Sequence, residues 1–300
     1  MTSSSHHIWM IHGPTASGKT RLAIDLARAL GCEIVNCDSR QLYREMSIGV
    51  ARPDAEELAE AAHHGIASHS IHQTISAGSY AQWATPIVNK LLAADHHVVI
   101  VGGSGLYAKA LLYGMDDLPP ADQKVRDQLE KRWAENAQGL VDELRDRDPE
   151  YATTADLKNP RRVIRAMEVI TLTGKSYSSQ RTQKELTPRF DAQVHEYAIW
   201  PEMDVLDERI IRRTAMMWDA GLPEEADSLK AHAALPAMRT VGYQEFYENP
   251  NANRAQLEGL IVTRTRQYAK RQMTWLKKQP NITRIPMGTD ASTILQSMAS

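Results

Sequence analysis

The phosphate-binding loop near the start of this 300-residue chain constrains its fold more than any other feature. The run Gly13-Pro14-Thr15-Ala16-Ser17-Gly18-Lys19-Thr20 matches the pattern G-x-x-x-x-G-K-[ST]. An apolar run, 8–11, precedes it and a helical pattern, 21–30, follows it, which is the strand–loop–helix context that the motif needs. The glycines let backbone N–H groups converge on phosphate oxygens, the lysine adds a positive charge, and the threonine hydroxyl can hold Mg²⁺. The loop therefore predicts that the chain binds a polyphosphate, without identifying which one.

Strands and helices alternate along most of the chain. The expected strands are 8–11, 32–37, 98–101, 194–200 and 282–286, and the expected helices are 21–30, 106–113, 207–220 and 253–278. Continuous β-branched runs that alternate with helices indicate a parallel sheet covered on both faces. We therefore predict a core of the α/β class built on a parallel sheet.

The pattern changes near residue 119, because only helical patterns occur from 122 to about 186. Apolar side chains recur every four positions at Val125, Leu129 and Trp133, and Pro160 suits the start of a further helix. The predicted fold class is therefore α/β, a parallel-sheet P-loop core with an inserted all-helical domain. We place the core at 1–116 and 195–300 and the insertion at 117–194.

Composition narrows the cellular setting of the chain. Hydrophobic residues make up 42% and charged residues 24%, which is typical of a globular protein. No stretch approaches the ~18–20 apolar residues that span a bilayer, so we expect no membrane partner. Cys32 and Cys37 cannot form a disulfide framework, and no nearby pattern completes a zinc site. A reducing cytoplasm fits this composition best.

Basic residues gather in one part of a chain whose formal net charge is −2. No Asp or Glu occurs from 259 to 289, a stretch that holds Arg264, Arg266, Lys270, Arg271, Lys277, Lys278 and Arg284. On a helical wheel, Ile261, Tyr268, Gln272 and Trp275 share one side, and the basic residues lie along both edges of the other. This pattern favours a cationic face for a nucleic-acid backbone, although a solvated charged face is the simpler alternative. A second cluster, Lys158, Arg161, Arg162 and Arg165, shares one face of a helix in the insertion.

Two further strand ends bear on which polyphosphate is bound. A phosphate-loop NTPase usually has an Asp after a second apolar strand to organise Mg²⁺. Here the strand 98–101 ends in Gly102-Gly103-Ser104-Gly105, which can be a second N–H cradle or only a tight turn. The acid that does end a strand is Asp38, which can act as a general base or a metal partner, or can cap the next helix.

Several motifs jointly resemble one family, the tRNA dimethylallyltransferases. The matching runs are 13–20, Asp38-Ser39-Arg40-Gln41-Leu42-Tyr43 with 46–49, 101–107, Asn159-Pro160-Arg161-Arg162-Val163-Ile164-Arg165 to Glu168, Gly221-Leu222 with Glu225, Val241-Gly242-Tyr243, and Tyr268-Ala269-Lys270-Arg271-Gln272 with Thr274-Trp275. They occur in order from residue 13 to residue 275, so the resemblance covers nearly the whole chain.

The resemblance implies a reaction in which a dimethylallyl group passes from dimethylallyl diphosphate to the exocyclic amine of an adenosine. That adenosine lies on the 3′ side of the tRNA anticodon and must leave its stack to react. By the resemblance, Asp38 takes the amine proton, Ser104 bonds the bridging oxygen of the leaving group, and Arg213 stabilises the released diphosphate. Ser104 stands where the family most often has threonine. The implied diphosphate-binding residues are Gly13, Thr15, Ala16, Ser17, Gly18, Lys19 and Thr20, and Thr20 would hold the implied cofactor, Mg²⁺.

The resemblance also implies an interface for the anticodon stem-loop of tRNA. The implied tRNA-binding residues are Asp38, Ser39, Arg40, Gln41, Arg161, Arg162, Val163, Ile164, Arg165, Arg239, Thr240, Val241, Gly242, Tyr243, Gln244, Lys270, Arg271, Gln272, Thr274, Trp275 and Lys277. The segment around His63 and His64 departs from the family pattern, because Ala67 and Ser68 stand where an acid is usual, so we assign these histidines no catalytic role. We expect the protein to act as a monomer.

Three other functions remain open on the sequence. A small-metabolite kinase with a phosphate loop would need ATP and would give the basic C-terminal helix no role. An adenylate isopentenyltransferase would prenylate a free nucleotide, but it would lack the insertion and the R-Q-x-T-W segment. An RNA-binding module without catalysis would leave the phosphate loop unused.

Overall fold

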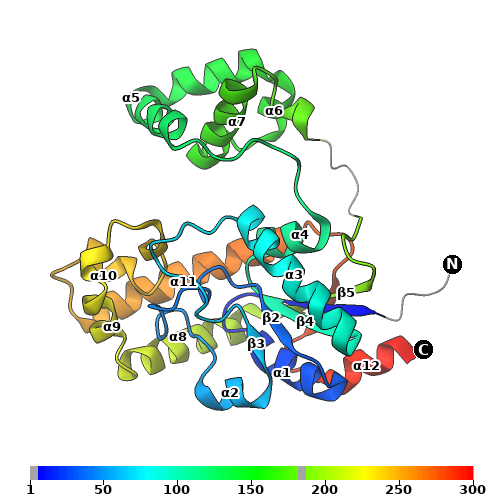
Figure 1. Cartoon of the computed structure of the whole chain (residues 1–300). Coiled ribbons are helices and arrows are strands. Elements are labelled where there is room, and N and C mark those ends of the chain that lie inside the picture. Colours follow the sequence, from blue (N-terminus) through cyan, green and yellow to red (C-terminus); the bar gives the residue numbers. More distant parts are fainter. Residues whose placement is uncertain (1–5, 182–186, 300) are drawn as a thin grey trace. The chain divides into compact units, whose positions relative to one another are not determined.

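The computed structural model describes residues 6–181 and 187–299 (Figure 1). The chain divides into two compact units, one formed by Met1–Gly114 with Pro188–Ser300 and the other by Met115–Thr187. We call the first unit the core and the second the insertion. The sequence predicts the insertion at 117–194. In the structure it begins at Met115 and ends at Thr187, and the core resumes at Pro188.

The core is built on a parallel sheet. Within the described residues it has six strands in the order β3-β2-β4-β1-β5-β6. The strands are β1 (His7–His12), β2 (Ile34–Asn36), β3 (His63–His64), β4 (His97–Gly102), β5 (Gln193–Trp200) and β6 (Thr283–Pro286). Every pair of neighbours runs parallel, which confirms the predicted α/β class.

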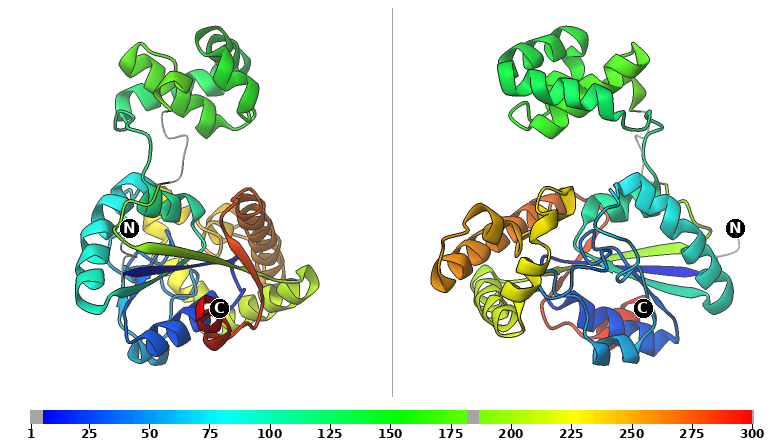
Figure 2. Two further views of the ribbon diagram at one scale, coloured as in Figure 1. Left: turned by 90° about the vertical axis from the view of Figure 1, so that its right-hand side faces the viewer. Right: turned by 60° about the vertical axis from the view of Figure 1, so that its left-hand side comes forward.

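Helices cover both faces of this sheet, as the continuous apolar strands predict. On one face, Trp9 and Ile11 of β1 pack with α1 (Lys19–Leu30) and α12 (Ala291–Ala299) in one buried cluster. Ile8 and Met10 point to the opposite face because side chains alternate along a strand. That face is covered by α3 (Ala77–Asp95) and α4 (Gly105–Tyr113), as Figures 1 and 2 show.

The C-terminal half of the core adds a pair of long helices. The helices α8 (Met203–Asp219) and α11 (Arg254–Leu276) pack against each other, and Ala16 of the phosphate loop shares a buried cluster with Leu206, Ile210 and Ala269. This cluster ties both helices to the loop. The short helices α2 (Ala55–Glu60), α9 (Leu222–Ser228) and α10 (Gln244–Glu248) complete this unit with single turns at Lys230–His232 and Pro236–Met238.

The regular elements of the insertion are all helices within the described residues. It contains α5 (Gln123–Arg147), α6 (Pro149–Thr154), α7 (Pro160–Thr173) and a turn at Ser178–Gln180. Leu129, Leu144, Val163 and Met167 lie in its buried cluster, so α5 and α7 pack through the apolar stripes that the sequence shows. The predicted helical stretch ends in residues 182–186, which lie outside the described residues.

Candidate functional site

Three segments singled out in the sequence meet at one edge of the sheet, because the strands that carry them are neighbours. The phosphate loop follows β1, Asp38 follows β2, and the glycine turn 102–105 follows β4. These strands lie side by side in the order β2-β4-β1 and run parallel, so their carboxyl ends share one edge. Val101 pairs with both Asn36 and Ile11, which brings the three strand ends level.

The phosphate loop wraps closely at the start of α1. Gly18 caps the helix with a φ of 90°, in the left-handed region that favours glycine. A Cβ on Gly13 would lie 2.6 Å from Ser17 Oγ, so a side chain here would have to displace the buried Ser17 hydroxyl. Ser17 Oγ is buried and has no hydrogen-bond partner within the described residues. Because a buried hydroxyl normally has a partner, the cradle fits a bound phosphate at the helix N-terminus.

The charged residues of the site act on one another. Burial lowers the pKa of Lys19 to about 8, while the Asp38 carboxylate acts to raise it and Arg213 to lower it. Burial also lowers the pKa of Arg213, against the same carboxylate, and Arg209 lowers it further. The structure therefore brings Lys19, Asp38 and Arg213 together. These two half-buried cations and one half-buried carboxylate leave an excess positive charge that a diphosphate would neutralise.

The end of β4 brings Ser104 against Ser39, the residue that follows Asp38. Gly102 has no room for a side chain, because a Cβ there would lie 2.1 Å from the Cys37 carbonyl oxygen. The Ser39 N–H donates to Ser104 Oγ (3.0 Å), and Ser104 Oγ donates to Ser39 Oγ (3.1 Å). Although Ser104 is the N-cap of α4, its hydroxyl makes no capping bond. Its hydroxyl is therefore directed to the site rather than to its own helix.

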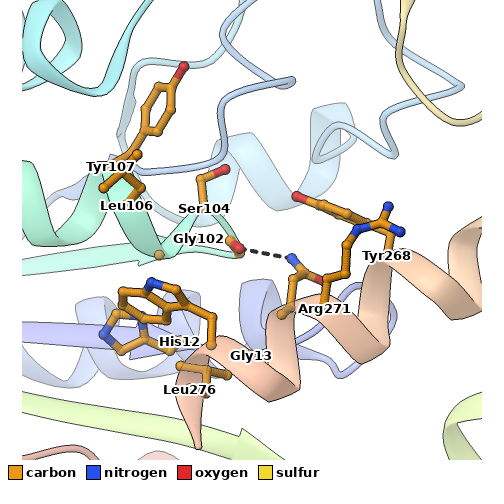
Figure 3. A pocket seen from close by; sticks show the side chains of 13 residues that line it. His12, Gly13, Gly102, Ser104, Leu106, Tyr107, Tyr268, Arg271 and Leu276 are labelled. Atoms are coloured by element: carbon orange, nitrogen blue, oxygen red, sulfur yellow. Dashed lines mark hydrogen bonds between the residues drawn. The ribbon is translucent and has the colours of Figure 1, made fainter. Parts of the chain in front are cut away.

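Gln272 of α11 braces the two glycine-rich segments. Its Oε1 accepts from the Thr15 N–H (2.9 Å), and its Nε2 donates to the Gly103 carbonyl oxygen (2.9 Å; Figure 3). The side chain is buried, and a Cβ on Gly103 would lie 2.2 Å from its Nε2. Trp275 lies one turn further along α11, and a Cβ on Gly105 would be only 2.4 Å from the Trp275 ring. The side of α11 that holds Tyr268, Gln272 and Trp275 thus packs on the site.

A cavity of about 250 Å³ lies between these segments (Figure 3). Leu106, Tyr107 and Trp275 give it apolar and aromatic walls, and Ser104 and Arg271 add polar groups. The rest of its lining is His12, Gly13, Gly102, Gly103, Gly105, Tyr268, Gln272 and Leu276. A mostly apolar space beside a phosphate cradle suits a small hydrocarbon attached to a phosphate.

His12 and Tyr268 line the cavity although the sequence implied no role for either, and of the two only Tyr268 lies in a motif quoted above. His12 is buried and its Nε2 lies 2.7 Å from Glu196 Oε2, while the Tyr113 hydroxyl bonds the other oxygen of the same carboxylate. Tyr268 comes from α11, and the Arg271 guanidinium lies 5.7 Å from the centre of its ring. Helical spacing places Tyr268 on the inner side of α11, whereas nothing local in the sequence pairs His12 with Glu196.

The donor atoms of the site fit a metal only if a substrate supplies some of the ligands. Within the described residues no three His, Cys, Asp or Glu side chains converge to hold an ion. Mg²⁺ commonly takes few protein ligands and completes its shell with phosphate oxygens and water. The hydroxyl of Thr20, at the first turn of α1, is compatible with that arrangement.

The residues implied in tRNA binding differ in exposure. Those exposed are Arg161, Arg162, Arg239, Lys270, Arg271, Thr274 and Lys277. Those half-buried are Asp38, Ser39, Arg40, Gln41, Arg165, Val241, Gln244 and Trp275. Those buried are Val163, Ile164, Thr240, Gly242, Tyr243 and Gln272. The buried side chains pack or brace in this structure, so the predicted interface depends on the other two groups.

Some expected cationic contacts are instead ion pairs inside the protein, which corrects the helical-wheel reading of α11. Arg264 pairs with Glu245 (3.3 Å) and Glu248 (2.6 Å) of α10. Arg266 pairs with Asp207 at 3.1 Å. A helical wheel describes one helix alone, so it does not include the acidic side chains of α8 and α10 that pair with α11.

The half-buried Arg165 of the insertion has a similar partner. It pairs at 2.7 Å with Glu168, whose carboxylate is fully buried. Its side chain also donates to the Pro119 carbonyl oxygen (2.7 Å). The guanidinium therefore serves the insertion's own packing.

The remaining motif residues have local partners. Glu225 accepts from the N–H groups of 47, 48 and 49 and from the Tyr243 hydroxyl, so three separate motif runs form one cluster. Both histidines of β3 have partners nearby. His63 Nδ1 lies 2.8 Å from the Ala61 carbonyl oxygen, and His64 Nε2 pairs with Glu33. None of the described helices is both long enough and apolar enough to cross a membrane.

Comparison with known proteins agrees with this geometry. A family model described as IPP transferase matches residues 41–279. A tRNA dimethylallyltransferase of Christiangramia forsetii is 40% identical over 282 residues, which cover 93% of this chain and 92% of that protein. The full-length tRNA isopentenylpyrophosphate transferase of Bacillus halodurans is 31% identical, and its crystal structure matches with a TM-score of 0.69 over 98% of this chain and 94% of its own.

A more distant structure supports the fold alone. A eukaryotic dimethylallyltransferase acting on tRNA is 23% identical and gives a TM-score of 0.84 over 98% of this chain and 78% of its own. The resemblance seen in the motifs is thus confirmed over most of the length of the chain. The protein belongs to the IPP transferase family.

Proposed function

We propose that this protein transfers a dimethylallyl group from dimethylallyl diphosphate to the exocyclic amine of the adenosine on the 3′ side of a tRNA anticodon. The observation that supports this most is the joining of a phosphate cradle to an apolar cavity that Ser104 lines, with Ser39, the neighbour of Asp38, bonded to the Ser104 hydroxyl. Relatives over nearly the whole chain carry the name tRNA dimethylallyltransferase. The enzyme is accordingly a prenyl transferase.

In the proposed reaction, different residues accept the proton of the nucleophile and stabilise the negative charge of the leaving group. The bond between the allylic carbon and the bridging oxygen breaks, and its electron pair stays with the diphosphate. The amine nitrogen forms the new bond to carbon, and Asp38 takes the proton that the amine loses. Ser104 donates to the bridging oxygen, and Lys19 and Arg213 stabilise the charge that develops on the diphosphate.

The phosphate loop holds the diphosphate in this proposal. The N–H groups of Ala16, Gly18, Lys19 and Thr20 would bind its oxygens, since the Thr15 N–H is bonded to Gln272 and the Ser17 N–H to the Pro14 carbonyl oxygen. The Thr20 hydroxyl would be the protein ligand of Mg²⁺. When bound, the metal neutralises charge on the leaving group. The cavity takes the dimethylallyl group against Leu106, Tyr107 and Trp275.

The tRNA interface is proposed on exposed side chains of both units. In the core these are Arg239, Lys270, Arg271, Thr274 and Lys277, and in the insertion Arg161 and Arg162. Cationic side chains bind the phosphate backbone without reading sequence. The reacting base must leave its stack to reach a half-buried carboxylate. A cytoplasmic site of action and a monomeric state remain predictions that accompany the tRNA substrate.

One incubation separates this function from its rivals. The protein is mixed with labelled dimethylallyl diphosphate and Mg²⁺, and either total tRNA or AMP is added as the acceptor. We expect label in tRNA, little in AMP, and no need for ATP. Label in AMP alone would support the adenylate enzyme, and phosphoryl transfer from ATP would support a kinase. No transfer to any acceptor, with tRNA binding intact, would leave only a binding module.

A further inference from the structure

A second arginine of α8 lies beside the phosphate loop and has no role in the reaction as proposed above. Arg209 comes one turn before Arg213, so helical spacing places both side chains on one flank of the helix. Next to this flank, Leu206 and Ile210 pack with Ala16 of the loop in one buried cluster. The packing therefore brings both arginines against the start of α1.

The guanidinium of Arg209 reaches the glycine that caps α1. Its Nη2 lies 3.6 Å from the position that a Cβ on Gly18 would take. Its Nη1 lies 3.6 Å from the sulfur of Met287, a weak acceptor in the segment that follows β6. The side chain is exposed, and no acidic partner for it occurs in the part of the chain that the structure describes. Its charge is thus available to a ligand at the N-terminus of the helix.

The cations around this helix N-terminus repel one another unless an anion lies between them. Arg209 acts to lower the pKa of Arg213, and Arg213 acts to lower the pKa of Lys19. A helix N-terminus is also partly positive, which disfavours cations beside it. Asp38 supplies one negative charge against these three positive ones. Together with the buried hydroxyl of Ser17, which has no partner among the described residues, this excess fits an anion that carries more than one negative charge.

We propose that Arg209 binds the terminal phosphate of dimethylallyl diphosphate, while Arg213 stabilises the phosphate that carries the allyl group. This inference rests on the proposed function, because it names that donor. The Asp38 carboxylate marks the end of the site where the bond to carbon breaks, and the same carboxylate attracts the Arg213 guanidinium. Arg209 lies one turn closer to the N-terminus of α8, against Gly18, and therefore faces the other end of the diphosphate. The terminal phosphate keeps its bonds during transfer, so this contact should strengthen binding of the donor without changing the rate at which the bound donor reacts.

The test compares ligands that have one phosphate or two. Dissociation constants are measured for pyrophosphate, dimethylallyl diphosphate and dimethylallyl monophosphate, with Mg²⁺ and without tRNA, so that no transfer occurs. Arg209→Ala should weaken binding of the first two about tenfold, as expected for losing one charged hydrogen bond, and binding of the monophosphate by less than about twofold. Single-turnover transfer to tRNA at saturating donor should stay within about threefold of wild type. Arg209→Lys should recover part of the affinity for both diphosphates, because it restores the charge.

Arg212→Ala is the matched control on the same helix. Arg212 is exposed, and helical spacing directs it away from Ile210 and the phosphate loop. All three affinities should stay within about twofold of wild type in this variant. Equal losses for the monophosphate and the diphosphates in Arg209→Ala, no loss for any of them, a single-turnover rate that falls as much as the affinity, or an equal loss in Arg212→Ala would overturn the inference. Wild-type protein whose pyrophosphate affinity depends on Arg209 but which transfers no dimethylallyl group would refute the proposed function instead.

Discussion

At the scale of single residues, the site holds its charges at a cost in solvation that a bound anion can offset. Lys19 and Arg213 are both driven toward their neutral forms by burial, and only Asp38 opposes this. A diphosphate supplies the missing negative charge, while the same carboxylate stays close enough to accept a proton. Substitutions at these positions should therefore affect binding and turnover separately.

Asp38→Asn should abolish turnover without abolishing binding. The amide cannot accept the amine proton, and a lost general base commonly costs ~10²–10⁴ in rate. The phosphate loop and the exposed cations are unchanged, so titrations with tRNA and pyrophosphate should give affinities near those of wild type. Turnover within a few-fold of wild type would show that Asp38 is not the base.

The affinity for pyrophosphate should fall as the pH rises through about 8. Lys19 has its pKa lowered to about 8 in the free protein, and a bound anion raises it again, so binding takes up a proton between the two values. Within that range the free lysine is neutral and must gain a proton on binding, which weakens binding as the pH rises; above it the lysine is neutral in both states and adds no further pH dependence. Lys19→Arg is the control that corrects for the titration of pyrophosphate itself, because arginine stays charged. Equal pH dependence in the two proteins would contradict this role for Lys19.

At the scale of elements, strong local patterns predict the structure and weak ones do not. The phosphate loop, β1 and β4 follow from a motif and from continuous apolar runs, and α11 from its two-sided pattern. The helix α3 is not predicted, because Ala77, Ala81 and Ala84 give a faint apolar stripe and Pro86 interrupts it.

Long-range pairings set the limit for the site itself. Asp38 and Ser104 are recognised as strand-end residues and by resemblance, but their closeness, through the bonds of Ser39 to Ser104, depends on β2 and β4 being neighbours. His12 and Glu196 lie 184 positions apart and meet only because β1 pairs with β5. No local pattern carries that information, so the buried pair had to be found in the structure.

The brace between α11 and the two glycine-rich segments gives a prediction at this scale. Gln272→Leu leaves the Thr15 N–H and the Gly103 carbonyl without their partner, at a cost of about 1–3 kcal/mol for each buried group left unpaired. Affinity for pyrophosphate should fall with the stability, because the loop loses its support. Gln267→Leu is the matched control on the same helix, since Gln267 is exposed, and it should change stability by less than about 0.5 kcal/mol. Indistinguishable denaturant melts for the two variants would rule out the brace.

At the scale of the whole molecule, the tRNA interface has fewer free cations than the sequence indicates. Arg264 and Arg266 are held by acids of the core, and Arg165 by the buried Glu168. Lys270 and Arg271 remain exposed on α11, and no ion pair to either occurs within the described residues. These two exposed side chains, of which Arg271 also lines the cavity, are the sharpest test of tRNA binding by α11.

Binding of tRNA should weaken as salt rises, and Lys270→Ala with Arg271→Ala should flatten that dependence. Each phosphate contact contributes about 0.7–0.9 to the slope of log binding constant against log salt concentration. The double substitution should therefore lower the magnitude of this slope by the contribution of up to about two contacts. Arg264→Ala is the comparison, because its guanidinium is already paired, and its slope should match wild type. An unchanged slope in the double variant would remove this helix from the interface.

The central claim is tested most directly by locating the transferred group. Total tRNA is incubated with the protein, Mg²⁺ and labelled dimethylallyl diphosphate, and the tRNA is then digested and its labelled fragments are sequenced. We predict label on the exocyclic amine of the adenosine that follows the anticodon on its 3′ side, appearing at least about a hundredfold more slowly when Asp38→Asn replaces the wild-type protein. Label at other positions, or labelling by Asp38→Asn at a rate within a few-fold of wild type, would contradict the account.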